Sequence, residues 1–367
     1  MSKKVLITVG GTGGHVFPAM SLAKKLLQDE PDIHLLFVGG GLSKNRYFAR
    51  ESFPFKEVSC GSLSLSKPLM ALRNAARILK GIWQSYRIMK KFKPDLVVGF
   101  GSYYTLPALL AAKTCAIPIV LHEANRLPGK VNRLMSKYVA LTGVFFPDTA
   151  NRLKGKSLEV AIPLREGYRL GSTSKEQAKT YFQLDPKNLT LLVFGGSQGA
   201  KAMNRLASEA IIKLNQSNLQ VLHFTGDAES ALCLQEEYTA HGIKATVKAF
   251  ETRMDMAWQA ADVVISRSGA GTIAEEIEFE VPGILIPFPY ATDNHQESNA
   301  DFMVDKVNGA VKCLEKELDA SRLAKAILSV LNDRKQLKEA IRQYKIQTKP
   351  LDLCAIVCEM AEKRSPL

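Results

Sequence analysis

His15 directly follows a glycine-rich stretch, GGTGG (10–14), and that stretch follows the apolar run Val5–Val9. A strand that ends in glycines and leads into a helix exposes backbone N–H groups, and the helix dipole at that end favours a phosphate or another anion. A neutral imidazole there could accept a proton from a substrate hydroxyl, because the same dipole disfavours its charged form. The alternative is a histidine that caps the helix or positions a substrate.

The same strand–glycine–helix design occurs at residues 10–14, 99–102, 195–199 and 268–271. None of these stretches matches G-x-G-x-x-G or G-x-x-x-x-G-K-[ST], which disfavours a dinucleotide dehydrogenase and a P-loop nucleotide hydrolase. The chain also has no D-x-D, so a diphosphate would be held by helix N-termini and arginines. Arg165 and Arg267 are the candidate arginines.

Polar side chains also follow other expected strands. His122, Glu123 and Asn125 come directly after one of them, and open α/β sheets bind ligands at the carboxyl ends of their strands. The alternative is that Glu123 caps the next helix and Asn125 turns the chain. Glu275 lies about one and a half helical turns past the fourth loop and could bind both hydroxyls of a ribose.

The neighbours of Glu275 and a later polar segment extend this pattern. We expect Glu276, Glu278 and Glu280 to lie on a solvated helix face. The segment DNHQESNA (293–300) offers many neutral donors and acceptors, which fit a sugar better than a planar base. Its candidate residues are Asp293, His295, Gln296 and Asn299.

The elements that position these residues alternate between strands and helices. The clearest strands are Val5–Val9, His34–Val38, Asp95–Gly99, Ile117–His122, Thr190–Phe194, Gln220–Phe224, Asp262–Ser266 and Gly283–Pro287. Most are continuous apolar runs, as expected for a parallel sheet covered on both faces. The strand–glycine–helix pattern at the start of the chain recurs at residues 189–211. A polar linker spans residues 154–175, between the two patterns. We therefore predict two Rossmann-like halves.

The net charge of +13 is unevenly distributed. Residues 1–160 hold 24 Lys and Arg against 9 Asp and Glu, whereas the remaining residues hold 25 against 27. This asymmetry predicts an anionic partner for the first half: nucleic acid, an acidic membrane surface or a phosphorylated substrate.

No apolar run approaches 18 residues, so we expect no membrane span. The 6 cysteines form no CxxC pair, which favours reduced thiols in a cytosolic protein.

Residues 59–94 contain no acidic residue, and within them 69–93 shows the spacing of an amphipathic helix. Such an apolar face usually packs in the core. Here bulky residues occupy more than one stripe and the charge is all positive, which suits an anionic membrane surface. No nucleic-acid motif accompanies the charge. The candidate membrane residues are Leu72, Arg73, Arg77, Leu79, Lys80, Ile82 and Trp83.

Six motifs, in this order, resemble the MurG family of glycosyltransferases: GGTGGHVFP (10–18), PDLVVGFGSY (94–103), HEAN (122–125), GGSQGA (195–200), RSGAGTIAE (267–275) and DNHQESNA (293–300). The resemblance extends from about residue 3 to beyond residue 300. It implies transfer of N-acetylglucosamine from UDP-GlcNAc to undecaprenyl-diphosphate-linked N-acetylmuramyl pentapeptide, with inversion at the anomeric carbon.

The resemblance also implies a GT-B fold, in which two Rossmann-like domains face each other across a cleft. Residues 1–164 would bind the acceptor and the membrane, joined by a C-terminal helix at about 342–367. Residues 165–341 would bind UDP-GlcNAc. By resemblance, the catalytic base is His15 or Glu123, and no metal or other cofactor is expected. The implied partners are UDP-GlcNAc, the lipid-linked acceptor and an anionic membrane at the cytoplasmic face, with no nucleic acid.

The implied substrate residues fall into two sets. Those expected around UDP-GlcNAc are Thr12, Gly13, Gly14, Asn125, Arg165, Ser197, Gln198, Phe250, Ser268, Gly269, Ala270, Glu275 and Gln296. Those on the acceptor side are Gly10, Gly11, Gly101, Ser102 and Tyr103, and Asn125 also carries over to that side. The chain departs from the family at Ala124, where glutamine is usual, and at AIPLR (161–165), where GNPVR is common. It also departs at Glu251, a position beside the uracil that is often apolar in the family.

Overall fold

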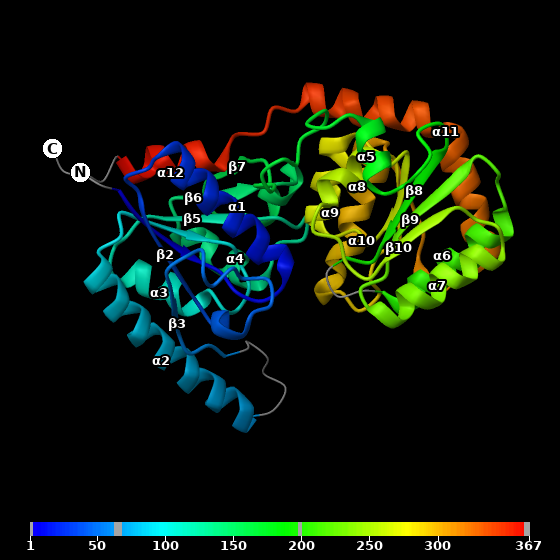
Figure 1. Ribbon diagram of the computed structural model, residues 1–367. Coiled ribbons are helices and arrows are strands. Elements are labelled where there is room, and N and C mark those ends of the chain that lie inside the picture. The colour runs from blue at the N-terminus through cyan, green and yellow to red at the C-terminus, as the bar shows by residue number, and fades with distance from the viewer. Residues whose placement is uncertain (1–2, 62–67, 197–199, 363–367) are drawn as a thin grey trace. The chain divides into compact units, whose positions relative to one another are not determined.

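The computed structural model describes residues 3–61, 68–196 and 200–362 (Figure 1). The chain forms two compact units, one from Met1 to Arg165 with Pro350 to Leu367, and the other from Glu166 to Lys349. The last long helix, α11 (Ala320–Gln347), lies wholly in the second unit. The return to the first unit therefore begins at Pro350 rather than near residue 342.

The first unit contains a parallel sheet with the order β3-β2-β1-β4-β5-β6-β7. Its strands are β1 (Lys4–Thr8), β2 (His34–Gly39), β3 (Phe55–Glu57), β4 (Leu96–Gly99), β5 (Ile119–Glu123), β6 (Leu141–Val144) and β7 (Ser157–Glu159). Its helices are α1 (Gly13–Asp29), α2 (Pro68–Phe92), α3 (Leu106–Thr114), α4 (Lys130–Met135) and α12 (Leu353–Glu362), with short 3₁₀ turns η1 (Leu42–Lys44), η2 (Ser136–Tyr138) and η3 (Pro147–Arg152).

The apolar runs form central strands because both faces of this sheet are covered. Val5 and Ile7 of β1 pack in one cluster with α1 and α12, whereas Leu6 packs in another with α2 and α3. Successive side chains of a strand point to opposite faces, so a continuous apolar run fills both clusters.

The end of the chain completes the first of these clusters. Leu351 exchanges backbone hydrogen bonds with Glu159 and Ala161, each 3.0 Å long. α12 then buries Leu353 and Val357 against α1 and the sheet.

The second unit repeats the architecture with the order β10-β9-β8-β11-β12-β13, again parallel. Its strands are β8 (Leu189–Phe194), β9 (Leu219–Phe224), β10 (Ala245–Lys248), β11 (Val263–Ser266), β12 (Gly283–Leu285) and β13 (Ala310–Lys312). Its helices are α5 (Lys175–Tyr181), α6 (Lys201–Leu214), α7 (Ala228–Ala240), α8 (Met254–Ala260), α9 (Ala270–Phe279), α10 (His295–Phe302) and α11, with short turns at Thr292–Asn294, Met303–Val307 and Glu315–Glu317. α6, α7 and α11 pack together on one face.

In both sheets the expected glycine loops leave from neighbouring strands. β1 and β4 are adjacent, and their following helices α1 and α3 cover opposite faces. β8 and β11 are adjacent in the same way in the second unit. A ligand crevice opens at such a switch point because the two connections leave in opposite directions.

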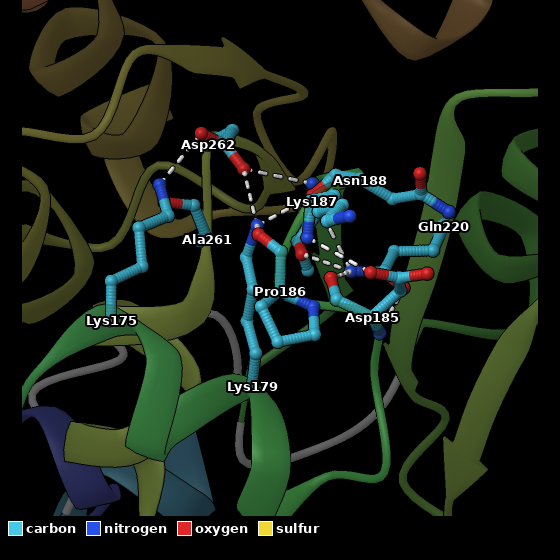
Figure 2. Close-up of polar contacts among 10 residues, drawn as sticks. Lys175, Lys179, Asp185, Pro186, Lys187, Asn188, Gln220, Ala261 and Asp262 are labelled. Atoms are coloured by element: carbon cyan, nitrogen blue, oxygen red, sulfur yellow. Dashed lines mark hydrogen bonds and ion pairs between the residues drawn. The ribbon is translucent and has the colours of Figure 1, made fainter.

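A buried lysine closes the opposite, amino-terminal edge of the second sheet (Figure 2). Lys179 is 3% exposed, and its ammonium donates to the carbonyls of Asn188 and Pro186 and lies 3.5 Å from the Asp262 carboxylate. Burial disfavours the charged amine and lowers the pKa of Lys179. Asp262 also pairs with the more exposed Lys175 at 2.6 Å.

We predict that Lys179→Met lowers the free energy of unfolding by about 2–3 kcal/mol, because it leaves buried acceptors without a donor. Lys175→Met is the matched control, since it removes the other cation from the same Asp262 but at a solvated position. We expect it to cost less than about 1 kcal/mol. Urea denaturation of the full chain measures both values, and equal losses would contradict the structural role assigned to Lys179.

Candidate functional site

The first glycine loop joins the end of β1 to the start of α1. Gly11 has a φ of +91°, a conformation that favours glycine, and α1 begins two residues later at Gly13. Thr12 and Gly14 are exposed at this helix end, and the Thr12 carbonyl accepts the N–H groups of His15 and Val16. The exposed N-terminus of this 17-residue helix can attract an anion.

His15 lies against the loop that follows β4. A methyl group added at Gly101 would lie 3.5 Å from the Cε1 atom of His15 and 3.2 Å from the Nδ2 atom of Asn132. Burial, and secondarily the charge of His15, lowers the pKa of His122 to about 3. The ends of β1, β4 and β5 therefore bring His15, Gly101, Asn132 and His122 together.

Glu123 is buried beside this group and is held by three N–H donors. One carboxylate oxygen accepts the Asn125 N–H, and the other accepts the Gly129 N–H and the Asn132 side-chain amide, each at 2.9 Å. Burial raises the pKa of Glu123, and these bonds oppose that rise. The carboxylate ties the end of β5 to the start of α4. This agrees with the alternative that Glu123 caps the next helix.

Asn132 is a site residue that the sequence did not single out. It is 2% exposed, and its amide also donates to the His122 carbonyl at 3.0 Å. The available signal was a polar residue on the buried face of the short helix KVNRLM, where its buried neighbours Val131 and Met135 are apolar.

The loop after β4 carries the expected acceptor-side residues. Ser102 has a φ of +70°, an unusual conformation for a residue with a side chain. Tyr103 is 36% exposed and packs on Tyr104 with their ring centroids 4.1 Å apart. Burial, followed by a hydrogen bond with Tyr104, raises the pKa of Tyr103 above its usual value. The half-buried Asn125 lies in a neighbouring loop, after β5.

The two candidate arginines differ in their surroundings. Arg165 ends the first unit, and its guanidinium lies 4.4 Å from the centre of the Phe17 ring, on α1. Arg267 is buried in the second unit, where it pairs with Glu315 at 2.5 Å and donates to the carbonyls of Ile286 and Pro287. Its charge is thus neutralised within the fold, so Arg267 does not fit the expected diphosphate role.

In the second unit the fourth loop joins β11 to the N-terminus of α9. Ser268 is buried and donates to the Gln296 carbonyl at 2.7 Å, while Asn299 donates to the Ser268 carbonyl at 3.1 Å. Gly269 precedes the first residue of the helix, Ala270. The equivalent loop after β8 is described only to Gly196, so Ser197 and Gln198 lie outside the described residues.

Two adjacent glutamates of α9 have different environments. Glu275 is half-buried and accepts the Trp258 indole N–H at 2.8 Å. Glu276 is fully buried, against Gly283 and 3.2 Å from the Ser266 hydroxyl, and burial raises its pKa well above the usual value. The expectation that Glu276 faces solvent was wrong, because this side of α9 packs on β12.

The remaining residues expected on the donor side lie at the same edge of the second sheet. The Gln296 side chain accepts the Phe288 N–H at 2.9 Å, and Asn299 is fully buried. Asp293 and His295 lie in and after the turn that precedes α10. Phe250 is 65% exposed after β10.

α2 presents an apolar and basic surface in the first unit. Leu72, Leu79 and Trp83 are 70%, 67% and 58% exposed, and the basic residues among them, Arg73, Arg77 and Lys80, are exposed as well. Ile82 instead packs against the cluster beneath the helix, so it departs from the expected surface set. Within the described ranges, no helix is long and apolar enough to cross a membrane. Nor do three or more His, Cys, Asp or Glu residues gather there as a metal site.

Known proteins are similar to this chain along its whole length. Models of the glycosyltransferase family 28 N-terminal and C-terminal domains match residues 5–144 and 190–352. A protein of Protochlamydia amoebophila, named UDP-N-acetylglucosamine--N-acetylmuramyl-(pentapeptide) pyrophosphoryl-undecaprenol N-acetylglucosamine transferase, is 50% identical over 100% of this chain and 98% of its own. A Chlamydia felis protein of the same name is 36% identical over 97% and 98%. The crystal structure of Acinetobacter baumannii MurG has a TM-score of 0.76 at 28% identity, covering 98% of this chain and 99% of its own.

The chain belongs to the MurG family. The expected GT-B class, with two parallel-sheet α/β domains, is confirmed. A more distant structure, a UDP-glucose:anthocyanidin 3-O-glucosyltransferase in complex with UDP, shares the fold with a TM-score of 0.70 at 15% identity, covering 99% of both chains.

We predict that Glu123→Gln destabilises the first unit by about 1–3 kcal/mol, because an amide would place N–H groups against donors that now meet oxygen. The exposed Glu51→Gln is the control. We expect it to change stability by less than about 0.5 kcal/mol. Urea denaturation gives both values. An unchanged midpoint for Glu123→Gln would refute the role of the Glu123 carboxylate in tying β5 to α4.

Proposed function

We propose that this protein transfers N-acetylglucosamine from UDP-GlcNAc to the C4 hydroxyl of undecaprenyl-diphosphate-linked N-acetylmuramyl pentapeptide, with inversion. The observation that carries the proposal is the position of His15, at the N-terminus of α1 and against Gly101. The full-length relatives named for this reaction support it. The first unit binds the acceptor, and the second binds UDP-GlcNAc.

In this mechanism His15 removes the proton from the attacking hydroxyl. The positive end of α1 favours the neutral imidazole, which is the form that can accept a proton. Glu123 is less suited to this step because three N–H groups already bind its carboxylate. We assign the acceptor diphosphate to the exposed end of α1, with Gly10, Gly11, Gly101, Ser102 and Tyr103 around the acceptor. Thr12, Gly13, Gly14 and Asn125 belong to the proposed set of UDP-GlcNAc-binding residues.

The donor site uses the carboxyl edge of the second sheet. Glu275 binds the ribose, and the Trp258 N–H fixes its orientation. The N-terminus of α9, at Ser268, Gly269 and Ala270, binds the diphosphate. The other donor residues in this proposal are Gln296 at the sugar, Phe250 beside the uracil, and Ser197 and Gln198 at the nucleotide.

Departure of UDP is stabilised by the α9 dipole and by Arg165, so the proposed reaction needs no metal ion. We assign the exposed surface of α2 to the anionic cytoplasmic face of the bacterial cell membrane. Its basic residues attract anionic lipid while Leu72, Leu79 and Trp83 enter the interface.

The direct test incubates labelled UDP-GlcNAc with the protein, with and without the muramyl lipid, in the presence of EDTA. Transfer that depends on the lipid and persists in EDTA supports the proposal. Formation of an epimer without acceptor would indicate a UDP-GlcNAc 2-epimerase. Binding without turnover would indicate a sugar-nucleotide sensor.

We predict that His15→Ala lowers kcat by about 10²-fold or more, the usual contribution of a general base. UDP affinity, measured by calorimetry, should stay nearly unchanged because the residues assigned to the ribose, the uracil and the helix N-terminus at the diphosphate lie in the second unit. His34→Ala, which alters an exposed histidine at the start of β2, is the control and should retain full activity. Full activity of His15→Ala would transfer the role of base to Glu123.

We predict that the triple charge reversal Arg73→Glu, Arg77→Glu and Lys80→Glu weakens binding to anionic vesicles by at least about 10²-fold, since each cation contributes about 1 kcal/mol at such a surface. Lys325→Glu, Lys335→Glu and Lys338→Glu change three exposed residues of α11 by the same total charge. This control should bind nearly as well as the wild type. Vesicle sedimentation measures the difference, and equal losses would remove α2 from the membrane surface.

A further inference from the structure

The first glycine loop is held in place by a side chain from a different loop. The Nδ2 atom of Asn45 donates to the carbonyl oxygen of Gly11 at 2.8 Å. The Oδ1 atom of the same side chain accepts the Tyr47 N–H at 2.9 Å. Both ends of the amide are thus engaged, and Asn45 links the loop after β1 to the segment after β2.

The segment that carries Asn45 is itself firmly attached to the first unit. Leu42 and Phe48, on either side of Asn45, are 0% and 4% exposed in the core. The Ser43 N–H donates to the Glu57 carboxylate, on β3, at 3.0 Å. Because both flanks are anchored, the Asn45 amide has a defined position from which to hold the glycine loop.

Tyr104 contacts the same loop from the segment after β4. A methyl group added at Gly10 would lie 2.6 Å from the Cβ atom of Tyr104, and one added at Gly40 would lie 2.6 Å from its Cδ1 atom. The Cys60 thiol also lies 3.3 Å from the Tyr104 carbonyl oxygen. The loops after β1, β2 and β4 and the segment after β3 therefore meet around one side chain.

The bond to the Gly11 carbonyl has a consequence for the next residue. The carbonyl of Gly11 and the N–H of Thr12 belong to one planar trans peptide group, so they point in opposite directions. Holding the carbonyl in place therefore also holds the Thr12 N–H. Thr12 in turn accepts the backbone N–H groups of His15 and Val16, which start α1.

We propose that Asn45 and Tyr104 are positioning residues for the acceptor site: they fix the Gly11–Thr12 peptide group, and through it the anion-binding shape of the loop and the place of His15. This inference rests on the proposed function for its kinetic consequence. A stretch with four glycines in five residues has high conformational freedom when nothing restrains it. Restraining it beforehand lowers the entropy lost when the acceptor binds.

The kinetic test compares Asn45→Ala with Lys44→Ala, a change at the neighbouring exposed residue. We expect Asn45→Ala to lower kcat/KM for the lipid acceptor by about 10–100-fold, the effect of a small misplacement of reacting groups. UDP affinity should change less than about twofold, the usual limit for independent sites, because the residues assigned to the ribose and the diphosphate lie in the second unit. Lys44→Ala should match the wild type. Equal kinetics for the two variants, or an equal loss of UDP affinity and turnover, would overturn the proposal.

A double-mutant cycle tests whether Asn45 acts through the histidine. In a His15→Ala background, Asn45→Ala should lower the residual rate by less than about twofold, because residues that act through one another are not additive. A full multiplicative loss would show that Asn45 acts independently of His15 and would overturn that link.

Hydrogen exchange decides the positioning role even if no transfer occurs. Amides of residues 10–16 should exchange faster in Asn45→Ala and in Tyr104→Ala than in the wild type, while Tyr104→Phe and Lys44→Ala should match it. Unchanged exchange in both alanine variants would overturn the proposal. Faster exchange with a wild type that transfers no sugar would leave the positioning intact and refute only the proposed function.

Discussion

In each unit, the position of the candidate site depends on two strand-to-helix loops that leave from adjacent strands at the centre of a parallel sheet. β1 and β4 are neighbours in the first unit, as β8 and β11 are in the second, and their following helices leave toward opposite faces. The backbone between each strand and its helix must turn sharply at that point. Glycines permit these turns, and the helix N-termini then face the space left between them. The arrangement of chemical groups follows from this constraint.

Around that edge the structure uses buried polar groups as supports. Glu123 and Asn132 tie the end of β5 to α4, and Asn45 ties the first glycine loop to the segment after β2. In the second unit the buried Arg267 pairs with Glu315, and the buried Glu276 accepts the Ser266 hydroxyl. Glu123, Asn132 and Arg267 thus hold neighbouring loops in place. His15 and Glu275, the residues to which we assign the base and the ribose contact, are only half-buried.

The sequence predicted the strands whose apolar runs are long enough to fill two covered faces. The structure contains all eight of these, with ends shifted by a few residues at most. β3, β7, β10 and β13 were not predicted, because they are short and only partly buried at or near the sheet edges. β6 is fully buried but its run, LTGV, is broken by a threonine and a glycine.

The candidate site was predictable to a similar extent. Glycines next to strands mark loops, so the loops and His15 could be located from local patterns. Asn45, Asn132 and Trp258 could not, because each acts on a group brought close only by folding. Arg267 and Glu276 were predicted to face a ligand or solvent, and both are buried. The sequence could not show this, because the ion pair of Arg267 and the burial that raises the pKa of Glu276 form only on folding.

The return of the chain to the first unit affects the order in which the protein can form during synthesis. α12 supplies Leu353, Cys354, Val357 and Ala361 to the cluster that covers one face of the first sheet. Those residues leave the ribosome only after the whole second unit has been made. The second unit can therefore close its core while the first still exposes an apolar face, although domains generally complete folding from the N-terminus. A nascent chain of this protein thus carries an unfinished amino-terminal unit until the second unit and α12 have been synthesised.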